Sequence, residues 1–224
     1  MYHKLDIRSE LSDINTAIDT INDEEFFKKT LNKPTGNFFY DAWEIKEEYK
    51  NTVWEKLLSQ LPEDIGEARV IQLSHGKCYQ SHADIDDRYH LTMQGQYSYI
   101  VNLDLDQMYK TNVDGNWYYL SGEPRHIAAN YGYIERIQLV VRRLLYKNTL
   151  IDPINVEIKP GNIELDYVRF RFDNLISSWL NRANVQGHLT NFGKTTTGCS
   201  FDLEKGMLDE LKSLTKDEFE IICK

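Results

Sequence analysis

The sequence has few cysteines and no long apolar run. The three cysteines, Cys78, Cys199 and Cys223, are an odd number without a Cys-x-x-Cys pair, so neither a disulfide framework nor a zinc knuckle is predicted. No window approaches the roughly 18 apolar residues of a membrane span, and the N-terminus lacks the apolar stretch of a signal peptide. We therefore expect a cytoplasmic protein with no membrane partner.

An excess of basic charge is also lacking, and this argues against a nucleic-acid partner. The formal net charge is -9, whereas phosphate binding relies on clustered lysine and arginine. The acidic residues are dispersed along the chain, which is typical of a solvated surface. With 224 residues, the chain is long enough to bury a conventional core without disulfides.

Helical spacing of apolar residues is found in residues 1–66, for which we predict an N-terminal helical segment packing on the core. Ile14, Ala17 and Ile18 indicate a first helix, and Asp23 is placed to cap a second one that continues to Leu31. From residue 43 to residue 61 apolar positions recur every three or four residues, and Pro62 follows. We expect this longer helix to cover the outside of a sheet.

The apolar period changes to two in residues 67–146, which predicts a β-rich core. Short strands are predicted at 68–73, 77–82, 89–94, 97–103, 108–113, 116–120 and 134–145. Asp114-Gly115 predicts a hairpin between two of them, because both residues tolerate positive φ. Short strands with tight turns, and no helix-length segment between them, favour a sandwich or barrel over a sheet of βαβ units. The predicted fold class is mainly β with flanking helices.

Residues 147–224 are predicted to form a C-terminal helical appendage. One amphipathic helix is indicated by apolar residues at helical spacing: Leu165, Val168, Phe172, Leu175, Ile176, Trp179 and Leu180. The stretch 187–198, rich in glycine and threonine, predicts a loop, and 203–214 predicts a last helix.

Three side chains of the β-rich segment have the residue types of a metal site. His82 and Asp84 form a His-x-Asp triplet at a strand end, where alternate residues project to the same face and can share one ion. A triplet of this kind is expected roughly once by chance in such a composition, so its strand context matters more than its presence. His126 must arrive from a strand distant in sequence but adjacent in the fold. Two histidines and one carboxylate, with other positions open, are the ligands of non-haem iron(II) oxygenases.

Arg136 is ten residues beyond His126, on the next predicted strand. A buried arginine is costly unless it meets an anion, and its planar fork suits a carboxylate held by two parallel hydrogen bonds. We therefore predict that Arg136 binds the far carboxylate of an oxo-acid co-substrate.

This pattern resembles that of the iron(II)- and 2-oxoglutarate-dependent dioxygenases. Within that superfamily, Arg88-Tyr89-His90 resembles the Arg-x-His strand of the aspartyl/asparaginyl β-hydroxylases and the bacterial proline hydroxylases. Gly115 and Trp117 resemble the glycine and tryptophan that those enzymes place ahead of the second histidine. Asn130 and the stretch Arg136-Ile137-Gln138-Leu139 resemble their His-x-x-x-Asn and Arg-x-x-Leu patterns. The similarity covers about residues 68 to 145, and one departure is that the animal aspartyl/asparaginyl enzymes lack the carboxylate ligand that Asp84 offers.

The resemblance implies a fold, an activity and roles for individual residues. The implied core is a double-stranded β-helix, which is a cupin-like jelly roll. The implied reaction hydroxylates an amino acid or a peptidyl side chain with O2 while 2-oxoglutarate is decarboxylated to succinate, and ascorbate would be a stimulant. His82, Asp84 and His126 would bind Fe(II), Arg136 would hold the C5 carboxylate of 2-oxoglutarate, and Arg88 and His90 would steady its C1 end.

Two readings without catalysis stay open from the sequence. In the first, the chain is a cupin-like module that binds a metal or ligand but performs no turnover; a closed four-ligand zinc site or an outward-pointing Arg136 would favour it. In the second, the helical ends bind a partner and the β core only presents them.

Overall fold

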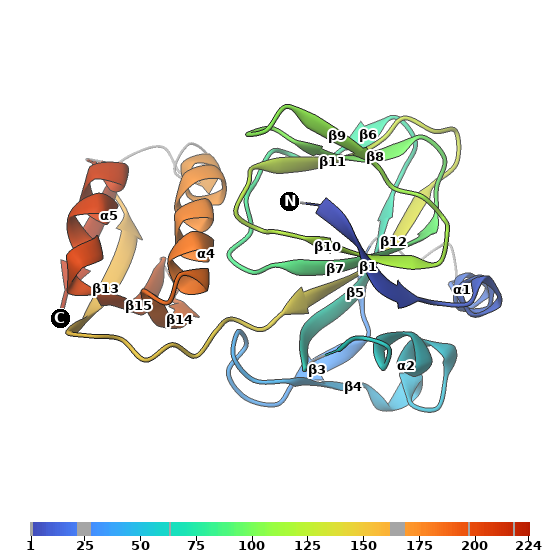
Figure 1. Cartoon of the computed structure of the whole chain (residues 1–224), viewed down its shortest axis with the longest axis horizontal. Coiled ribbons are helices and arrows are strands. Elements are labelled where there is room, and N and C mark those ends of the chain that lie inside the picture. Colours follow the sequence, from blue (N-terminus) through green and yellow to red (C-terminus); the bar gives the residue numbers. More distant parts are fainter. Residues whose placement is uncertain (1, 22–27, 63, 162–168, 197, 217) are drawn as a thin grey trace.

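The computed structural model describes residues 2–21, 28–62, 64–161, 169–196, 198–216 and 218–224. The protein is mainly β, with antiparallel sheets and few helices, which confirms the broad fold class. Two sheets face each other, and a third sheet lies beside them in the C-terminal part (Figure 1). Among the described residues, no helix is both long and apolar enough to cross a membrane.

The larger of the two facing sheets has six strands in the order β1-β10-β7-β12-β5-β2. Their bounds are β1 (Tyr2–Arg8), β10 (Asn116–Leu120), β7 (Arg88–Gln94), β12 (Arg136–Arg143), β5 (Ile65–Leu73) and β2 (Lys28–Thr30). The central strand β12 is buried along nearly its whole length, because one face of the sheet meets the helices and the other meets the second sheet.

The second sheet has four strands in the order β6-β11-β8-β9. Their bounds are β6 (Lys77–Cys78), β11 (His126–Asn130), β8 (Ser98–Asn102) and β9 (Gln107–Lys110). The chain passes repeatedly from one sheet to the other between β5 and β12, so residues on the inner faces of both sheets line a shared interior.

Helices cover the outer face of the larger sheet, as predicted, but they are shorter than expected. Helix α1 (Leu11–Asp19) places Ile14 and Ala17 in the same core as Leu91 of β7. The prediction of one long helix over residues 43–61 was wrong over most of this stretch. The stretch begins with strand β4 (Trp43–Ile45), which pairs with β3 (Asn32–Pro34). It continues with two short helices, η1 (Glu47–Tyr49) and α2 (Val53–Leu58).

A residue with positive φ explains why the helix is shorter than predicted. Asn51 has a φ of 58°, which no helix interior accepts, and the Thr52 side chain then accepts a hydrogen bond from the Trp54 N–H to cap α2. The helix predicted from Asp23 to Leu31 begins in residues 22–27, outside the described part of the chain. Its end was wrong, because Lys28–Thr30 is strand β2 and pairs with β5.

Asp114-Gly115 does not close the predicted hairpin. β9 pairs with β8, whereas β10 pairs with β1 and β7, so the segments on either side of the turn belong to different sheets. The expected positive φ is present, at 79° for Gly115. The Ser9 N–H donates to the Gly115 carbonyl at 2.8 Å, and a Cβ on Gly115 would lie 2.5 Å from the Ser9 carbonyl. The turn therefore anchors the end of β1 at a crossing between sheets.

The C-terminal part combines helices with an antiparallel sheet, so the prediction of a helical appendage missed its strands. Its sheet has the order β14-β15-β13-β16, with β13 (Pro153–Pro160), β14 (Leu189–Lys194), β15 (Cys199–Glu204) and β16 (Phe219–Cys223). The remaining elements are η2 (Phe172–Ile176), α4 (Ser177–Val185), η3 (Lys205–Met207) and α5 (Leu208–Thr215). We call this part, from β13 to β16, the C-terminal unit.

Two sequence predictions in this unit need correction, and a third agrees with the structure where it is described. The stretch 187–198 contains strand β14 and is not only a loop, and the helix predicted over 203–214 begins only at Leu208. The helix predicted from Leu165 begins outside the described residues, since Leu165 and Val168 are not among them, but its later part is helical. Figure 1 shows the unit in orange and red beside the facing sheets, with α4 nearer to them than α5.

A candidate metal centre between the facing sheets

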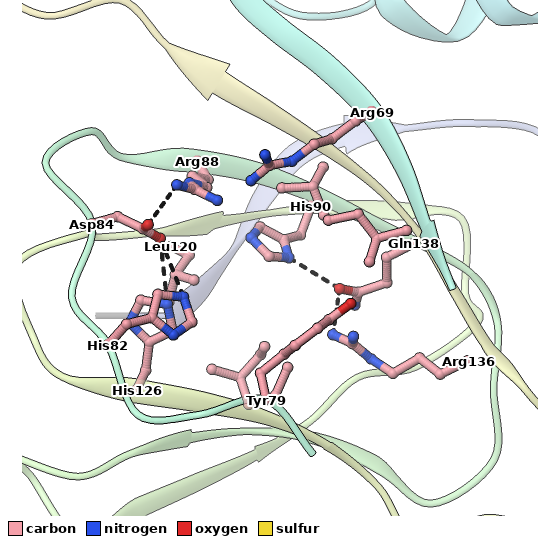
Figure 2. Close-up of a pocket in the computed structure, with 14 residues that line it drawn as sticks. Arg69, Tyr79, His82, Asp84, Arg88, His90, Leu120, His126, Arg136 and Gln138 are labelled. Atoms are coloured by element: carbon pink, nitrogen blue, oxygen red, sulfur yellow. Dashed lines mark hydrogen bonds and ion pairs between the residues drawn. The ribbon is translucent and has the colours of Figure 1, made fainter. Parts of the chain in front are cut away.

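His82, Asp84 and His126 lie together at one end of a cavity between the two facing sheets (Figure 2). The Oδ2 atom of Asp84 is 3.5 Å from Nε2 of His126 and 3.9 Å from Nε2 of His82. One ligand atom from each of the three residues lies within 4.8 Å of the others. Two ligands that are each about 2.1 Å from one ion can be at most about 4 Å apart, so the Asp84 distances suit a shared ion. The predicted convergence of the three side chains is confirmed.

A backbone bridge places the two imidazoles side by side. His82 and His126 form an antiparallel bridge in which each N–H donates to the carbonyl of the other, at 3.1 and 2.8 Å. Residues that exchange both hydrogen bonds in this way are directly opposite each other, so their side chains project to the same face. The ring centroids are accordingly 4.6 Å apart.

Hydrogen bonds at Nδ1 fix the tautomer of both histidines. Nδ1 of His82 is 2.8 Å from the carbonyl oxygen of Gln80, and Nδ1 of His126 is 2.8 Å from that of Pro124. A carbonyl only accepts, so each Nδ1 carries a proton and donates it. Each Nε2 then has a free lone pair directed toward Asp84, and this is the form in which histidine binds metals. Burial also lowers the pKa of His82, which favours this neutral form.

Asp84 has one oxygen that is paired and one that is not. Its Oδ1 accepts a hydrogen bond from Nη2 of Arg88 at 2.5 Å, whereas its Oδ2 is buried without a hydrogen-bond partner among the described residues. Burial alone would raise the pKa of Asp84, but the charge of the Arg88 guanidinium outweighs it and holds that pKa well below its usual range. A buried, charged oxygen that faces two lone pairs is unfavourable unless a cation lies between them. The donor set therefore fits a divalent metal ion.

Gly122 supports the loop of residues 79–87, which joins β6 to β7 and carries His82 and Asp84, and which we call the ligand loop. Its carbonyl accepts from the Asp84 N–H at 2.8 Å, and its own N–H donates to Oδ1 of Asp87 at 2.9 Å. A Cβ at this position would lie 2.5 Å from the Asp86 carbonyl and 2.6 Å from the Asp84 carbonyl. Only glycine allows the two backbones to approach this closely.

We expect Gly122→Ala to displace the ligand loop. The clash is with backbone atoms, which cannot rotate away, so stability should fall by about 1–3 kcal/mol and metal affinity should fall with it. Chemical unfolding and metal titration measure the two effects. Gly206→Ala is the matched control, because a Cβ at Gly206 meets no atom within 4 Å. Equal behaviour of the two variants would contradict this role of Gly122.

Arg136 lies at the opposite end of the cavity and is only 2% exposed (Figure 2). Its Nη2 donates to Oε1 of Gln138, a neutral amide, and its Nε is buried without a partner. Among the described residues, no carboxylate lies within ion-pair distance of its guanidinium. Burial lowers the pKa of Arg136 to about 10, and the nearby Tyr2 and Tyr79 oppose this effect only in part. This end of the cavity is ready to receive an anion.

Arg88 and His90, both on β7, line the same cavity. Arg88 directs its Nη2 at Asp84 and lies 3.6 Å from Oδ1 of Asp86, so it orients the ligand carboxylate. Nδ1 of His90 is 3.1 Å from Oε1 of Gln138, and its Nε2 is buried without a partner. Burial, followed by the charge of Arg136, lowers the pKa of His90 to about 3. That Arg88 and His90 contact the C1 end of a co-substrate remains a prediction.

The lowered pKa of His90 makes stability depend on pH. Below the ordinary histidine pKa of about 6.5, the unfolded chain takes up a proton that the folded protein refuses until about pH 3. Stability should therefore fall with acidification across that window, by about 1 kcal/mol at pH 5.5 for His90. Urea unfolding of metal-free protein at pH 7 and pH 5.5 measures the loss. The loss should shrink in His90→Gln and persist in His75→Gln, which changes an exposed histidine; an undiminished loss in His90→Gln would disprove the assignment.

The cavity has a volume of about 310 Å³ and contains functional candidates that sequence reasoning missed. Arg69 on β5 is one of them, and its Nε is buried without a partner. The alternation of buried Ala68 and Val70 with Arg69 is the signal that could have placed it on the inner face. Trp117 does not line this cavity; it is fully buried in the core and donates from Nε1 to Oγ of Ser9 at 3.1 Å.

Comparison with known proteins gives no further assignment. No protein-family model and no curated protein matches the chain. The functional argument therefore depends on the geometry of this cavity.

Proposed function

We propose that the protein is an iron(II)- and 2-oxoglutarate-dependent oxygenase that hydroxylates an amino acid or a peptidyl side chain. The observation that supports this proposal best is the pairing of two sites within one cavity. One end carries two histidines and a carboxylate with an orphaned oxygen, and the other end carries the buried, uncompensated guanidinium of Arg136. A molecule with a metal-chelating end and a carboxylate at its far end would satisfy both, and 2-oxoglutarate is such a molecule.

The strand order supports a double-stranded β-helix core. If β5 to β12 are numbered as eight strands, the first pairs with the last (β5 with β12) and the second with the seventh (β6 with β11). The third pairs with the sixth (β7 with β10) and the fourth with the fifth (β8 with β9). This is the pattern of one long hairpin rolled up so that its strands alternate between two sheets, which is how a jelly roll is built.

The residues of the cavity would divide the work as follows. A bound iron(II) ion would supply the oxidation, using the coordination positions that the three protein ligands leave open. Arg88 holds Asp84 in the orientation in which its free oxygen faces the two Nε2 atoms. Arg136 would bind the C5 carboxylate of the co-substrate, and Gln138 orients Arg136 through the amide oxygen that His90 also approaches. The apolar side chains of Ile100, Leu120, Ala128 and Val140 exclude water from the same space.

Succinate formation tests this proposal. Purified protein with iron(II), ascorbate, O2 and labelled 2-oxoglutarate is expected to release succinate, more rapidly when a mixture of amino acids and peptides is added. His82→Ala, which removes one ligand, should be inactive. Release no faster than that of His82→Ala in every mixture would disprove the oxygenase proposal.

The same preparation separates the oxygenase from a binding module without turnover. A structural zinc site is closed by four protein ligands, whereas the group found among the described residues offers three. Tight zinc binding together with absent succinate formation in iron(II) would favour the binding module.

A further inference from the structure

A second cavity lies on the other side of the ligand loop, between the facing sheets and the C-terminal unit. Its volume is about 230 Å³. It shares Arg69, His82, Asp84 and Arg88 with the first cavity, so both cavities reach the candidate metal position. Its outer wall comes from the C-terminal unit and includes Phe172, Asp173, Ser177, Leu180, Phe192 and Lys194.

Hydrogen bonds attach this outer wall directly to the ligand loop. The Ala83 N–H donates to the Asp173 carbonyl at 2.6 Å. Ser81 and Asn174 exchange two hydrogen bonds, of 2.5 and 2.8 Å. From α4, Nδ2 of Asn181 donates to Oδ1 of Asp87 at 3.1 Å. These hydrogen bonds hold the outer wall of the second cavity in a defined position relative to the ligand loop.

The wall segment that carries Asp173 is a π-helix, η2 (Phe172–Ile176). Such wide turns are rare and occur often at functional sites, because they change the direction of side chains within a helix. Here Ile176 is fully buried in the core of the unit while Asp173 lines the cavity. The wide turn thus places a carboxylate beside the ligand loop without disturbing the core.

The charges that line the second cavity are only partly compensated. Arg142 binds Asp86 through two hydrogen bonds of 2.5 and 2.9 Å, and Arg88 pairs with Asp84, so the charges of these four groups compensate each other. Arg69 contacts Glu67 through Nη1 at 3.2 Å, but its buried Nε has no partner.

Two further charges come from the C-terminal unit. Lys194, at the end of β14, is exposed at the cavity wall. Asp173 lies 3.8 Å from Arg169, whose side chain is 84% exposed, and a pair of this kind contributes little. Together with Arg69, the cavity therefore offers two cationic groups and one carboxylate to a ligand, beside the apolar side chains of Phe172, Leu180 and Phe192.

We propose that the second cavity binds the primary substrate as a free amino acid, with its carboxylate at Arg69 and Lys194 and its ammonium group at Asp173. This inference rests on the proposed function, in which the first cavity holds the oxo-acid. The mixed charges complement a zwitterion, and the apolar wall complements an apolar side chain. Pockets for drug-sized ligands have about 300–1,000 Å³, so a cavity of about 230 Å³ suits a molecule as small as one amino acid.

Binding measurements on Lys194→Gln and Asp173→Asn test the proposal. These two residues line only the second cavity, so neither change should alter the affinity for 2-oxoglutarate. We would titrate the proteinogenic amino acids, their N-acetyl amides and short peptides into zinc-loaded protein, detecting binding by saturation-transfer NMR and calorimetry. An apolar amino acid is expected to bind, and each variant should weaken it about tenfold or more, the effect of losing one charged hydrogen bond. Lys205→Gln, an exposed lysine outside both cavities, should bind like the wild type.

Three outcomes would overturn this inference: no free amino acid binds, the N-acetyl amides or peptides bind as tightly as the free amino acid, or both variants retain wild-type affinity. Failure of the proposed function looks different. It would appear as absent succinate formation while an amino acid binds in the manner described. Succinate formation without any amino acid binding would instead remove the substrate assignment and leave the oxygenase.

Discussion

Arg136→Met is expected to make the protein more stable and much less able to bind 2-oxoglutarate. Methionine has a similar length but no charge. Arg136 is 2% exposed, and among the described residues its guanidinium donates a hydrogen bond to the neutral Gln138 and meets no carboxylate. Replacing such an uncompensated buried charge by an apolar group should raise the free energy of unfolding by about 1–4 kcal/mol. Loss of the two charged hydrogen bonds to a carboxylate should weaken 2-oxoglutarate binding by about 100-fold or more.

The measurement compares unfolding of the free protein with calorimetric titration of 2-oxoglutarate into anaerobic, iron(II)-loaded protein. Arg182→Met is the control, since it removes an exposed arginine of the C-terminal unit that lines neither cavity. A ligand that binds only the folded state stabilises it, so wild-type protein should gain stability with added 2-oxoglutarate and Arg136→Met should gain almost none. Equal affinity in wild type and variant would remove Arg136 from the co-substrate site.

Asp84→Asn is expected to abolish stoichiometric metal binding while preserving the fold. Asparagine keeps the shape and an oxygen for Arg88, but its amide nitrogen would donate to the Nε2 lone pairs that a metal needs. Metal affinity should fall by more than about 100-fold, since changes to residues that only support ligands already cost about 10–100-fold. Succinate formation should be lost with the metal.

Metal content after dialysis against a chelator measures this effect. Asp152→Asn is the control, because that carboxylate is 73% exposed and far from the ligand set. Arg88 retains Asp86 at 3.6 Å, so the variant should lose only about 1–3 kcal/mol of stability and remain folded at room temperature. Iron bound at one equivalent with unchanged affinity would contradict the assignment of Asp84 as a ligand.

The sequence predicted that His82, Asp84 and His126 converge, because their residue types are those of a metal site. The strand predicted over 77–82 is shorter, since β6 ends at Cys78, but His82 forms a bridge with His126 and Asp84 still lies beside both histidines. His126 could lie beside His82 and Asp84 only if its strand paired near His82, and the β-bridge between the two histidines provides this pairing. The alternation around Arg69 could have placed that side chain on the inner face, but the role of Gly122 could not be predicted, because it depends on which loop lies opposite.

The β-rich middle of the chain was predicted better than its two ends. Strands β5, β7, β8 and β12 follow the apolar alternation that the sequence displays. The prediction of a hairpin failed at Asp114-Gly115, because the chain crosses there to another sheet. The positive φ of Gly115 was predicted correctly, but the residues of a turn specify its conformation and not which strands pair. The prediction from sequence also failed in the C-terminal unit, where the alternation of Val156 and Ile158 belongs to strand β13, which the predicted helical appendage did not include.

Hydrogen bonds between the ligand loop and the C-terminal unit would link metal binding to the order of that unit. Because Ala83 donates to Asp173, and Asn181 donates to Asp87, a metal that ordered the loop would also slow local opening of η2 and α4. Such coupling is reciprocal. If the metal raises the affinity for a substrate that orders the unit, that substrate raises the affinity for the metal by the same factor. Amide hydrogen exchange along α4, compared with and without metal, would record this communication between two parts of the chain that share no metal ligand.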